Sequence, residues 1–386
     1  MKTKSFLLFS TSVFAISIFL IVFHSQPPQS IQSIVTQTHQ HIKDFQASLS
    51  RQENLRDVEE NHLVQEEQYA RLLGLDGRQE LWHNTSLPAI VTYARNDAHA
   101  QAVSFVRAAA KLPYTVLLYN LGLKPYSLAI VSNYCNSSKC AIIDLDLDVF
   151  PSHVSDESIH AVRPLIIQHA LSRVGGVVFC EASQRWAGSA GELAALWARA
   201  ASGAGVLAWP RRAAVTSLTH PRMFHYFHAN IDDFLFVQML DLTRLIVVNK
   251  PAVTDIMRPW IQCALTLDCI MPIGAQSVGC RFDKKPQYRY SGCHGQDASA
   301  LSIVLGLRSG FEEASYAVRA ARPRWRSVPD AAARAELAAL LRNTTDQPAR
   351  PAPPARSLPT LTRILLYQCV LTCEKTVGEI NLAGTW

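Results

Sequence analysis

Three aspartates at alternate positions are the first residues of this chain whose spacing could do chemistry. Asp144, Asp146 and Asp148 lie in the run CAIIDLDLDVF, which we predict to be a strand over residues 140–150. Alternate residues of a strand point to the same face, so the three carboxylates would share one side of the sheet. A carboxylate pair at a strand end can hold a divalent cation beside a diphosphate. The run therefore predicts either a metal site or a charged, solvent-facing strand edge.

A second acidic group ends the next apolar run of the sequence. Glu181 and Ser183 follow VGGVVFC, within a predicted strand at residues 174–183. A buried parallel strand delivers the side chains at its carboxyl end to the ligand crevice, so Glu181 is a second candidate for the same chemistry. The alternative interpretation is a simple ion pair between Glu181 and the nearby Arg185.

The third group lies in GCHGQDASAL, residues 292–301. Asp297 stands just before a helical stretch and could cap that helix. A functional interpretation makes Asp297 a carboxylate that holds a donor or acceptor hydroxyl. His294 would then be a ligand for a metal ion or a phosphate.

Apolar runs and helical stretches alternate around these residues. Buried strands separated by helices indicate an α/β domain with a mostly parallel sheet, and from residue 215 to 305 the pattern becomes mixed. Ligands of open α/β sheets bind outside the carboxyl ends of the strands, where the candidate residues are expected. The predicted strands are 88–95, 114–123, 128–135, 140–150, 174–183 and 205–210, and the predicted helices are 97–111, 156–173, 190–202 and 254–267.

The N-terminal segment predicts a membrane anchor. Residues 5–23 carry no charge and would rise about 28 Å as a helix, which matches a bilayer core. Lys2 and Lys4 precede the span, so the positive-inside rule places the rest of the chain in the secretory lumen, as a single-pass type II protein. A cleaved signal peptide is the alternative, and it leads to the same compartment. The predicted organisation is a cytosolic tip and anchor (1–24), a stem (25–85), a lumenal domain (86–342) and a Pro-rich, divergent tail (343–386).

The stem is polar and lacks Gly and Pro from residue 31 to 73. A solvated helical spacer is the simpler interpretation. The alternative is a short coiled coil that would make the protein a homodimer.

Cysteine spacing and sequons agree with a lumenal address. Near pairs of cysteines suit disulfides in an oxidising compartment, whereas Cys180 lies in an apolar run and is expected to be a buried free thiol. A net charge of +6 without basic clusters excludes nucleic acid as an expected partner. The candidate disulfides are Cys135/Cys140, Cys263/Cys269 and Cys280/Cys293, with a further near pair at Cys369/Cys373, and the candidate glycosylation sites are Asn84, Asn136 and Asn343.

A series of short motifs between residues 88 and 310 gives the chain a family resemblance. It resembles an invertebrate family of single-pass type II membrane proteins that carry a GT-A-like glycosyltransferase domain. The motifs that carry the resemblance, in order, are YNLGL (119–123), FPSHV (150–154), RPLII (163–167), GGV (175–177) with EASQR (181–185), HPRMF (220–224), WIQCAL (260–265) and GCH (292–294) with the run to Leu301.

The resemblance implies a Rossmann-like nucleotide-binding half joined to an acceptor half. It implies a Golgi-type enzyme that transfers a sugar from a nucleotide diphosphate donor to a glycan or glycoprotein acceptor, aided by a divalent cation such as Mn²⁺. The family's strand-end acid and serine fall on Glu181 and Ser183, so the metal or donor role moves there from the three aspartates. Arg163 stands where the family has a lysine and would face phosphate.

The chain departs from the family at several of these positions. Glu181 replaces an aspartate, and four residues near Asp297 differ from the family pattern. A catalytically silent lumenal binding or assembly protein is therefore the alternative hypothesis, and a metal-dependent hydrolase using Asp144, Asp146 and Asp148 is a third. The four substituted positions are Gly295, Gln296, Ala298 and Ser302.

Overall fold

The computed structural model describes residues 67–76, 82, 87–283, 286–319 and 324–345. The predicted anchor, most of the stem, Asn84 and the tail after residue 345 lie outside these ranges. Within them, no helix is both long and apolar enough to cross a membrane.

A six-stranded sheet forms the centre of the fold, with the order β3-β2-β1-β4-β7-β6. The first four strands in this order are parallel, and β7 runs antiparallel to both of its neighbours. The sheet is therefore mostly parallel, as the sequence predicts. The strands are β1 (Ala89–Asn96), β2 (Val116–Leu123), β3 (Cys140–Asp144), β4 (Gly176–Cys180), β6 (Val206–Ala214) and β7 (Gln238–Val248).

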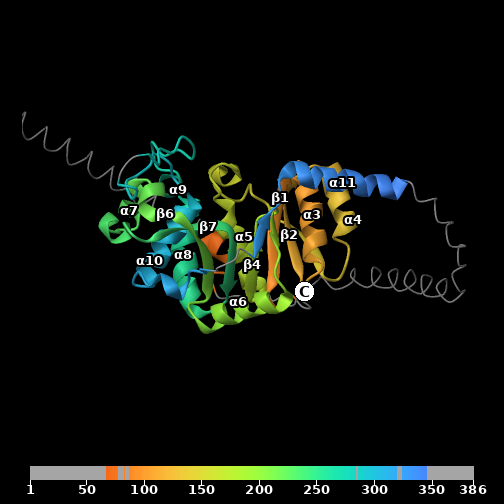
Figure 1. Ribbon diagram of the computed structural model, residues 1–386, viewed down its shortest axis with the longest axis horizontal. Helices are drawn as coiled ribbons and strands as arrows, with labels where there is room; N and C mark the ends of the chain where they lie inside the picture. Colours follow the sequence, from red (N-terminus) through yellow and green to blue (C-terminus); the bar gives the residue numbers. More distant parts are fainter. Residues whose placement is uncertain (1–66, 77–81, 83–86, 284–285, 320–323, 346–386) are drawn as a thin grey trace, which may run out of the picture.

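Helices cover both faces of this sheet (Figure 1). Ala89 and Val91 of β1 pack into one cluster with Leu165 and Ile261, whereas Ile90 packs into another with Phe105. Apolar residues on both sides of a strand are what a sheet buried on two faces requires. The longer helices are α3 (His99–Ala109), α4 (Pro125–Tyr134), α5 (Val162–Val174), α6 (Ala190–Ser202), α8 (Pro251–Leu265), α10 (Asp297–Arg308) and α11 (Asp330–Thr345).

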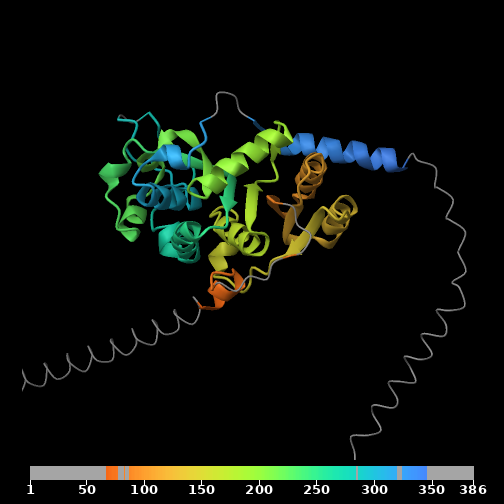
Figure 2. The same cartoon turned by 90° about the horizontal axis from the view of Figure 1, so that it is seen from below.

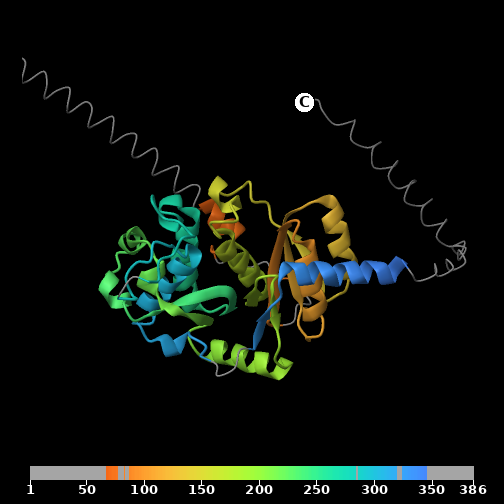
Figure 3. The same cartoon turned by 45° about the horizontal axis from the view of Figure 1, so that its top comes forward.

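Smaller elements complete the two sides of the molecule. Figures 2 and 3 show α11 lying against α3, and Ser104 of α3 donates a hydrogen bond to Glu336 of α11. The short elements are α7 (Pro221–Tyr226), α9 (Leu267–Ile270) and a separate two-stranded sheet of β5 (Gln184–Trp186) and β8 (Trp325–Ser327).

One predicted strand is a helix, and another is shorter than predicted. Residues 128–135 belong to helix α4, which begins at Pro125. Proline suits the first position of a helix, and a short apolar run alone does not distinguish a strand from a buried helix. Strand β3 ends at Asp144, so Asp146 and Asp148 lie beyond it. Strand β7 was not predicted, because it lies in the segment whose pattern is mixed.

The three cysteine pairings predicted within the described residues are confirmed. Disulfides join Cys135 to Cys140, Cys263 to Cys269 and Cys280 to Cys293. Cys180 is a buried free thiol, as predicted. The first bridge joins the end of α4 to the start of β3, and the third holds the loop that leads into α10.

Candidate functional site

A cavity of about 490 Å³ opens at the carboxyl ends of β1 and β4. The chain proceeds from β1 to β2 on one side of the sheet and later places β4 on the other side, so the cavity lies where the strand order reverses. Open α/β sheets bind ligands at such a reversal, and this volume is typical of small-molecule sites. The titratable residues in its lining are Arg95, Asp97, Glu157, His160, Glu181, Asp330 and Arg334.

Glu181 lines this cavity, and behind it two buried residues from other motifs, Arg163 and Asp297, meet. Nη2 of Arg163 donates a hydrogen bond to Oδ1 of Asp297 over 3.1 Å, and its Nε lies 2.9 Å from Oδ2. Nη1 of the same guanidinium donates to Oε1 of Glu181 over 3.2 Å. The geometry brings α5, the end of β4 and the start of α10 together around one cation.

The carboxylates of Asp297 and Glu181 differ in how deeply they are buried. The side chain of Asp297 is 0% exposed, whereas that of Glu181 is 25% exposed and lines the cavity. Burial raises the pKa of Asp297 to about 7, although Arg163 acts in the opposite direction. Burial also raises the pKa of Glu181, again against the effect of Arg163. Glu181 is therefore the member of this trio that can reach a ligand.

Asp297 is held in place from several directions. Its Oδ1 accepts the backbone N–H of Ala298 over 2.8 Å, and its carbonyl accepts the indole N–H of Trp260 over 2.9 Å. The side chain of Asp297 thus accepts a hydrogen bond from one of the backbone N–H groups in the first turn of α10, which have no partner within the helix, and it also binds Arg163. The preceding Gln296 has a positive φ of 46°, which is unusual for a residue with a side chain.

His294 makes two backbone contacts. Its Nδ1 accepts the N–H of His220 over 3.2 Å, so its Nε2 donates to the carbonyl of Ile270 over 3.1 Å. Burial lowers the pKa of His294 to about 4, which keeps the ring neutral. Both ring nitrogens are engaged, so His294 has no nitrogen left to bind a metal ion or phosphate.

The three alternate aspartates do not converge on a common point. Asp144 accepts a hydrogen bond from Asn120 over 2.7 Å, and Asp146 accepts the N–H of Asp148 over 2.9 Å. All three side chains are exposed. No group of three or more His, Cys, Asp or Glu residues among those the structure describes is arranged to hold a metal ion.

The residues at the cavity do not fit a divalent cation. A hard cation needs several carboxylate or carbonyl oxygens directed at one point. Here the carboxylates of Glu181 and Asp297 are directed at the guanidinium of Arg163, which would repel a second cation placed between them. The role that we assign to each residue of this site does not depend on Mn²⁺.

Arg95 is a site residue that the sequence analysis missed. It is 8% exposed and lines the cavity from the end of β1. Its Nη1 donates to the carbonyl of Ser155 over 2.9 Å and its Nε lies 3.6 Å from Glu157, while its buried Nη2 has no hydrogen-bond partner among the described residues. The sequence feature that could have identified Arg95 is the charged run YARND (93–97) at the end of a predicted strand.

The other predicted residues fall close to these. Ser183 lines the cavity beside Glu181. Arg185 does not pair with Glu181, because its guanidinium donates to the carbonyls of Ala182 and Gln184. Asn136 and Asn343 are exposed, as glycosylation would require.

Comparisons with known proteins give only distant matches. No family profile and no curated protein matches the chain. Solved structures similar to it include the galactosyltransferase LgtC with donor and acceptor sugar analogs (12% identity, TM-score 0.29, covering 45% of this chain and 59% of that one). Mouse xyloside xylosyltransferase 1 has 10% identity and a TM-score of 0.33, over 60% of this chain and 84% of that one. GlyE of Streptococcus pneumoniae TIGR4 has 12% identity and a TM-score of 0.32, over 60% of this chain and 44% of that one.

The chain thus spans less than two thirds of LgtC in that complex and of GlyE. All three proteins are glycosyltransferases by name, but likeness this distant does not transfer an activity. Function has to be argued from the site itself.

Proposed function

We propose that this protein is a glycosyltransferase that moves a sugar from a nucleotide diphosphate donor to a glycan or glycoprotein acceptor. The observation that carries the proposal is the contact of Arg163 with both Asp297 and Glu181, of which Glu181 lines the cavity. Arg163 and Glu181 are 18 positions apart, and Asp297 is 134 positions from Arg163. Each belongs to a different motif of the family resemblance, and together they lie at the strand-order reversal where α/β sheets bind nucleotides.

We assign Glu181 the catalytic role, in direct contact with the reacting groups. In the proposed transfer, the bond between the donor sugar and the diphosphate breaks, and an acceptor oxygen bonds to the sugar carbon and loses its proton. A partly buried carboxylate with a raised pKa is suited to accept a proton from a hydroxyl. Arg163 and Asp297 are positioning residues, because both are too buried to touch a substrate.

The remaining lining suits a ligand that combines hydroxyls with phosphate. Asp97, Glu157 and Asp330 offer carboxylate oxygens to hydroxyl groups. Arg95 places a positively charged guanidinium in the lining, which attracts an anionic group. A sugar nucleotide carries both kinds of group.

We further propose a lumenal, membrane-anchored location in the secretory pathway. Disulfides persist in oxidising compartments, and the three bridges support this address. The anchor itself and the Golgi as the particular compartment are inferences from the sequence.

One observation favours a second candidate, a catalytically silent binding protein. Arg163 already neutralises the carboxylates that would otherwise bind a metal and assist the reaction. A protein that has lost activity could keep this ion cluster for its structure alone.

A thermal-shift panel separates the two candidates. The purified protein is heated with nucleoside diphosphates and common sugar nucleotides, each with Mn²⁺ or EDTA, beside Arg95→Gln and the exposed control Arg342→Gln. A ligand at 100 times its dissociation constant adds about 2.7 kcal/mol of stability. We expect a shift with one nucleotide family that Arg95→Gln loses and Arg342→Gln keeps. No shift in a folded sample would sink the transferase proposal and favour the silent protein.

A further inference from the structure

A second, larger cavity has Arg211 in its lining. Its volume is about 800 Å³. The end of β6 supplies Arg211 and Arg212, the segment before β7 supplies Phe236, and the loop before α10 supplies Phe282, Gln287 and Tyr288. No element of the proposed donor site forms part of this lining.

The charge of this second cavity differs from that of the first. Its lining contains two arginines and no acidic residue, whereas the first cavity has four carboxylates in its lining. Arg211 lies 3.6 Å from Asp241. Arg212 is exposed and forms no ion pair with any residue that the structure describes. An anion entering the cavity therefore finds a free guanidinium.

Aromatic rings stand exposed around the arginines. Phe236 is 84% exposed, Phe282 is 55% exposed and Tyr288 is 38% exposed. The rings of Phe236 and Tyr288 meet edge to face with centroids 6.2 Å apart. Exposed aromatic side chains gathered at one cavity mark a binding surface, because burying them against a ligand recovers their apolar area.

Covalent and hydrogen-bonded contacts hold this wall in place. Thr216 donates its hydroxyl to the carbonyl of Tyr288 over 2.6 Å. The Cys280–Cys293 disulfide ties the loop to the residues that lead into α10. A wall fixed in this way loses less conformational entropy when a ligand binds.

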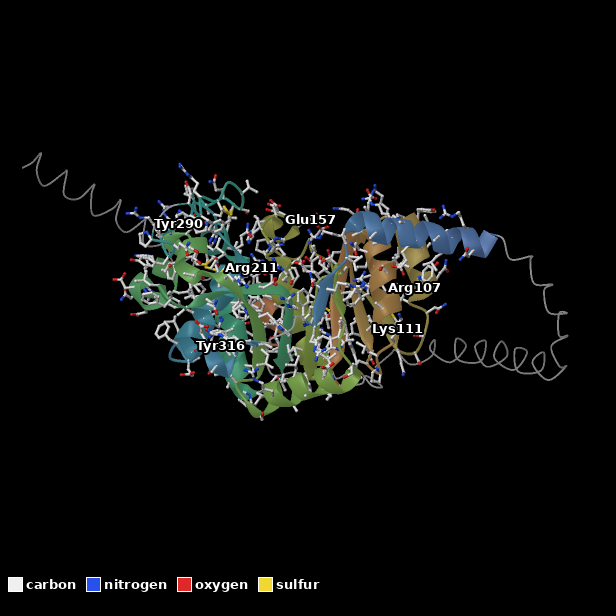
Figure 4. All side chains as sticks on the ribbon, in the orientation of Figure 1. Arg107, Lys111, Glu157, Arg211, Tyr290 and Tyr316 are labelled. Atoms are coloured by element: carbon white, nitrogen blue, oxygen red, sulfur yellow. A yellow bond between two sulfur atoms is a disulfide. The ribbon has the colours of Figure 1, made fainter. Side chains whose placement is uncertain are left out.

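The second cavity adjoins the proposed reaction centre. Arg211 lies 3.6 Å from Asp241 of β7, and the backbone N–H of Glu181 donates to the carbonyl of Thr243, two residues further along the same strand, over 2.9 Å. Gln296 donates hydrogen bonds to the carbonyl of Ser158, near the rim of the first cavity, and to the hydroxyl of Ser277, in the wall of the second. In Figure 4, the labelled Arg211 lies between Tyr290 and Glu157 along the long axis of the molecule.

We infer that the second cavity is the acceptor subsite, and that it takes a glycan with negatively charged sugars. The pyranose rings pack on Phe236 and Tyr288, and Arg212 pairs with a carboxylate or sulfate of the glycan. This inference rests on the proposed glycosyltransferase function, because it assigns the acceptor class of the same site.

The test measures glycan binding directly, by calorimetry with the full-length protein. The probes are hexasaccharides of hyaluronan, which carries carboxylates, of chondroitin sulfate, which adds sulfates, and of chitin, which is neutral. We expect at least one anionic probe to bind about tenfold more tightly than the neutral one, since each charge-assisted contact contributes on that order. Preference between the two anionic probes tells carboxylate from sulfate.

Two substitutions at exposed positions locate the site. Arg212→Gln should remove the preference for the anionic probe, and Phe236→Ala should weaken binding of that probe by about tenfold or more. Arg342→Gln and Tyr126→Ala, both exposed and outside this lining, are the matched controls and should change neither. Both test residues are exposed, so folding is expected to survive their loss.

Several outcomes would overturn the inference. Equal affinity for neutral and anionic probes, no binding of any probe, or unchanged binding in Arg212→Gln would each do so. Nucleotide binding without glycan binding would remove the acceptor subsite and leave the transferase proposal standing. Glycan binding without any nucleotide binding would remove the transferase and keep a glycan-binding cavity.

Discussion

The guanidinium of Arg163 and the carboxylate of Asp297 face each other in the protein interior, with Nε 2.9 Å from Oδ2. Neither side chain has useful access to water, because they are 7% and 0% exposed. A buried ion pair of this kind contributes little net stability, but each partner becomes costly when the other is removed. This relationship determines which changes at the site the fold can tolerate.

Arg163→Leu should destabilise the protein strongly. The change leaves Asp297 without its cation in a site where burial already raises the pKa of that carboxyl to about 7. We expect a loss of about 3–5 kcal/mol of unfolding free energy, measured by urea denaturation at pH 7.5.

The double variant Arg163→Leu with Asp297→Leu is the matched control. Replacing both charges by apolar side chains removes the unpaired group, so the double variant should be more stable than Arg163→Leu alone. A double variant less stable than both single variants would show that the pair is a net source of stability.

Glu181→Gln should separate activity from folding. Burial disfavours the charged form of this carboxylate, so the neutral amide is expected to leave the melting temperature unchanged or raise it. If Glu181 accepts the proton of the acceptor hydroxyl, sugar transfer should fall by about 100-fold or more. Unchanged transfer in a folded Glu181→Gln protein would remove Glu181 from the reaction.

His294 should make the protein sensitive to acid. Its pKa is about 4 in the folded protein, against 6.5 for an unperturbed histidine. Between pH 4 and pH 6.5, His294 therefore binds a proton more readily in the unfolded chain than in the folded protein. The histidine's contribution is fully present above pH 6.5 and is lost as pH falls through about 4, by up to about 1.4 kcal/mol per pH unit.

Comparison with His294→Gln measures this effect. The variant loses the two backbone contacts but cannot take up the proton. Its stability deficit against the wild type should therefore be largest near pH 7 and shrink toward pH 4, as followed by urea denaturation at each pH. A deficit that stays constant with pH would contradict the neutral, buried ring.

Gly176→Ala should destabilise the start of β4. A Cβ atom at this position would overlap the indole ring of Trp197 on α6. Inserting a methyl group into a packed site costs about 1–3 kcal/mol, which thermal and urea unfolding will detect. Gly191→Ala is the control, since its Cβ would make only ordinary contact and alanine favours a helix. Equal stabilities for the two variants would contradict this packing.

The sequence alone predicted much of the framework. Hydrophobic runs broken by turn residues located β1, β2, β4 and β6, because strands buried on both faces need continuous apolar sequence. The spacing of cysteines also predicted the three disulfides, since close pairs form short loops. Residues 128–135 were assigned to a strand in error, because periodicity cannot classify so short an apolar run.

The site itself was only partly predictable. Glu181, Arg163 and Asp297 were singled out from motifs, but the sequence does not reveal that one guanidinium holds both carboxylates. Local alternation suggested that Asp144, Asp146 and Asp148 could form a metal site. The described structure leaves them exposed at the edge of the sheet, because β3 ends at Asp144.

The sequence by itself determined the α/β class, the cysteine pairing and the strand ends at which the candidate residues lie, because these depend on local pattern. Only the tertiary structure decided that Arg163 rather than a metal ion faces Glu181 and Asp297, that Arg95 lines a cavity together with Glu181, and that Arg211 and Arg212 line a second one. These facts depend on distances between residues far apart in the chain, and such distances are fixed only when the helices and strands pack together.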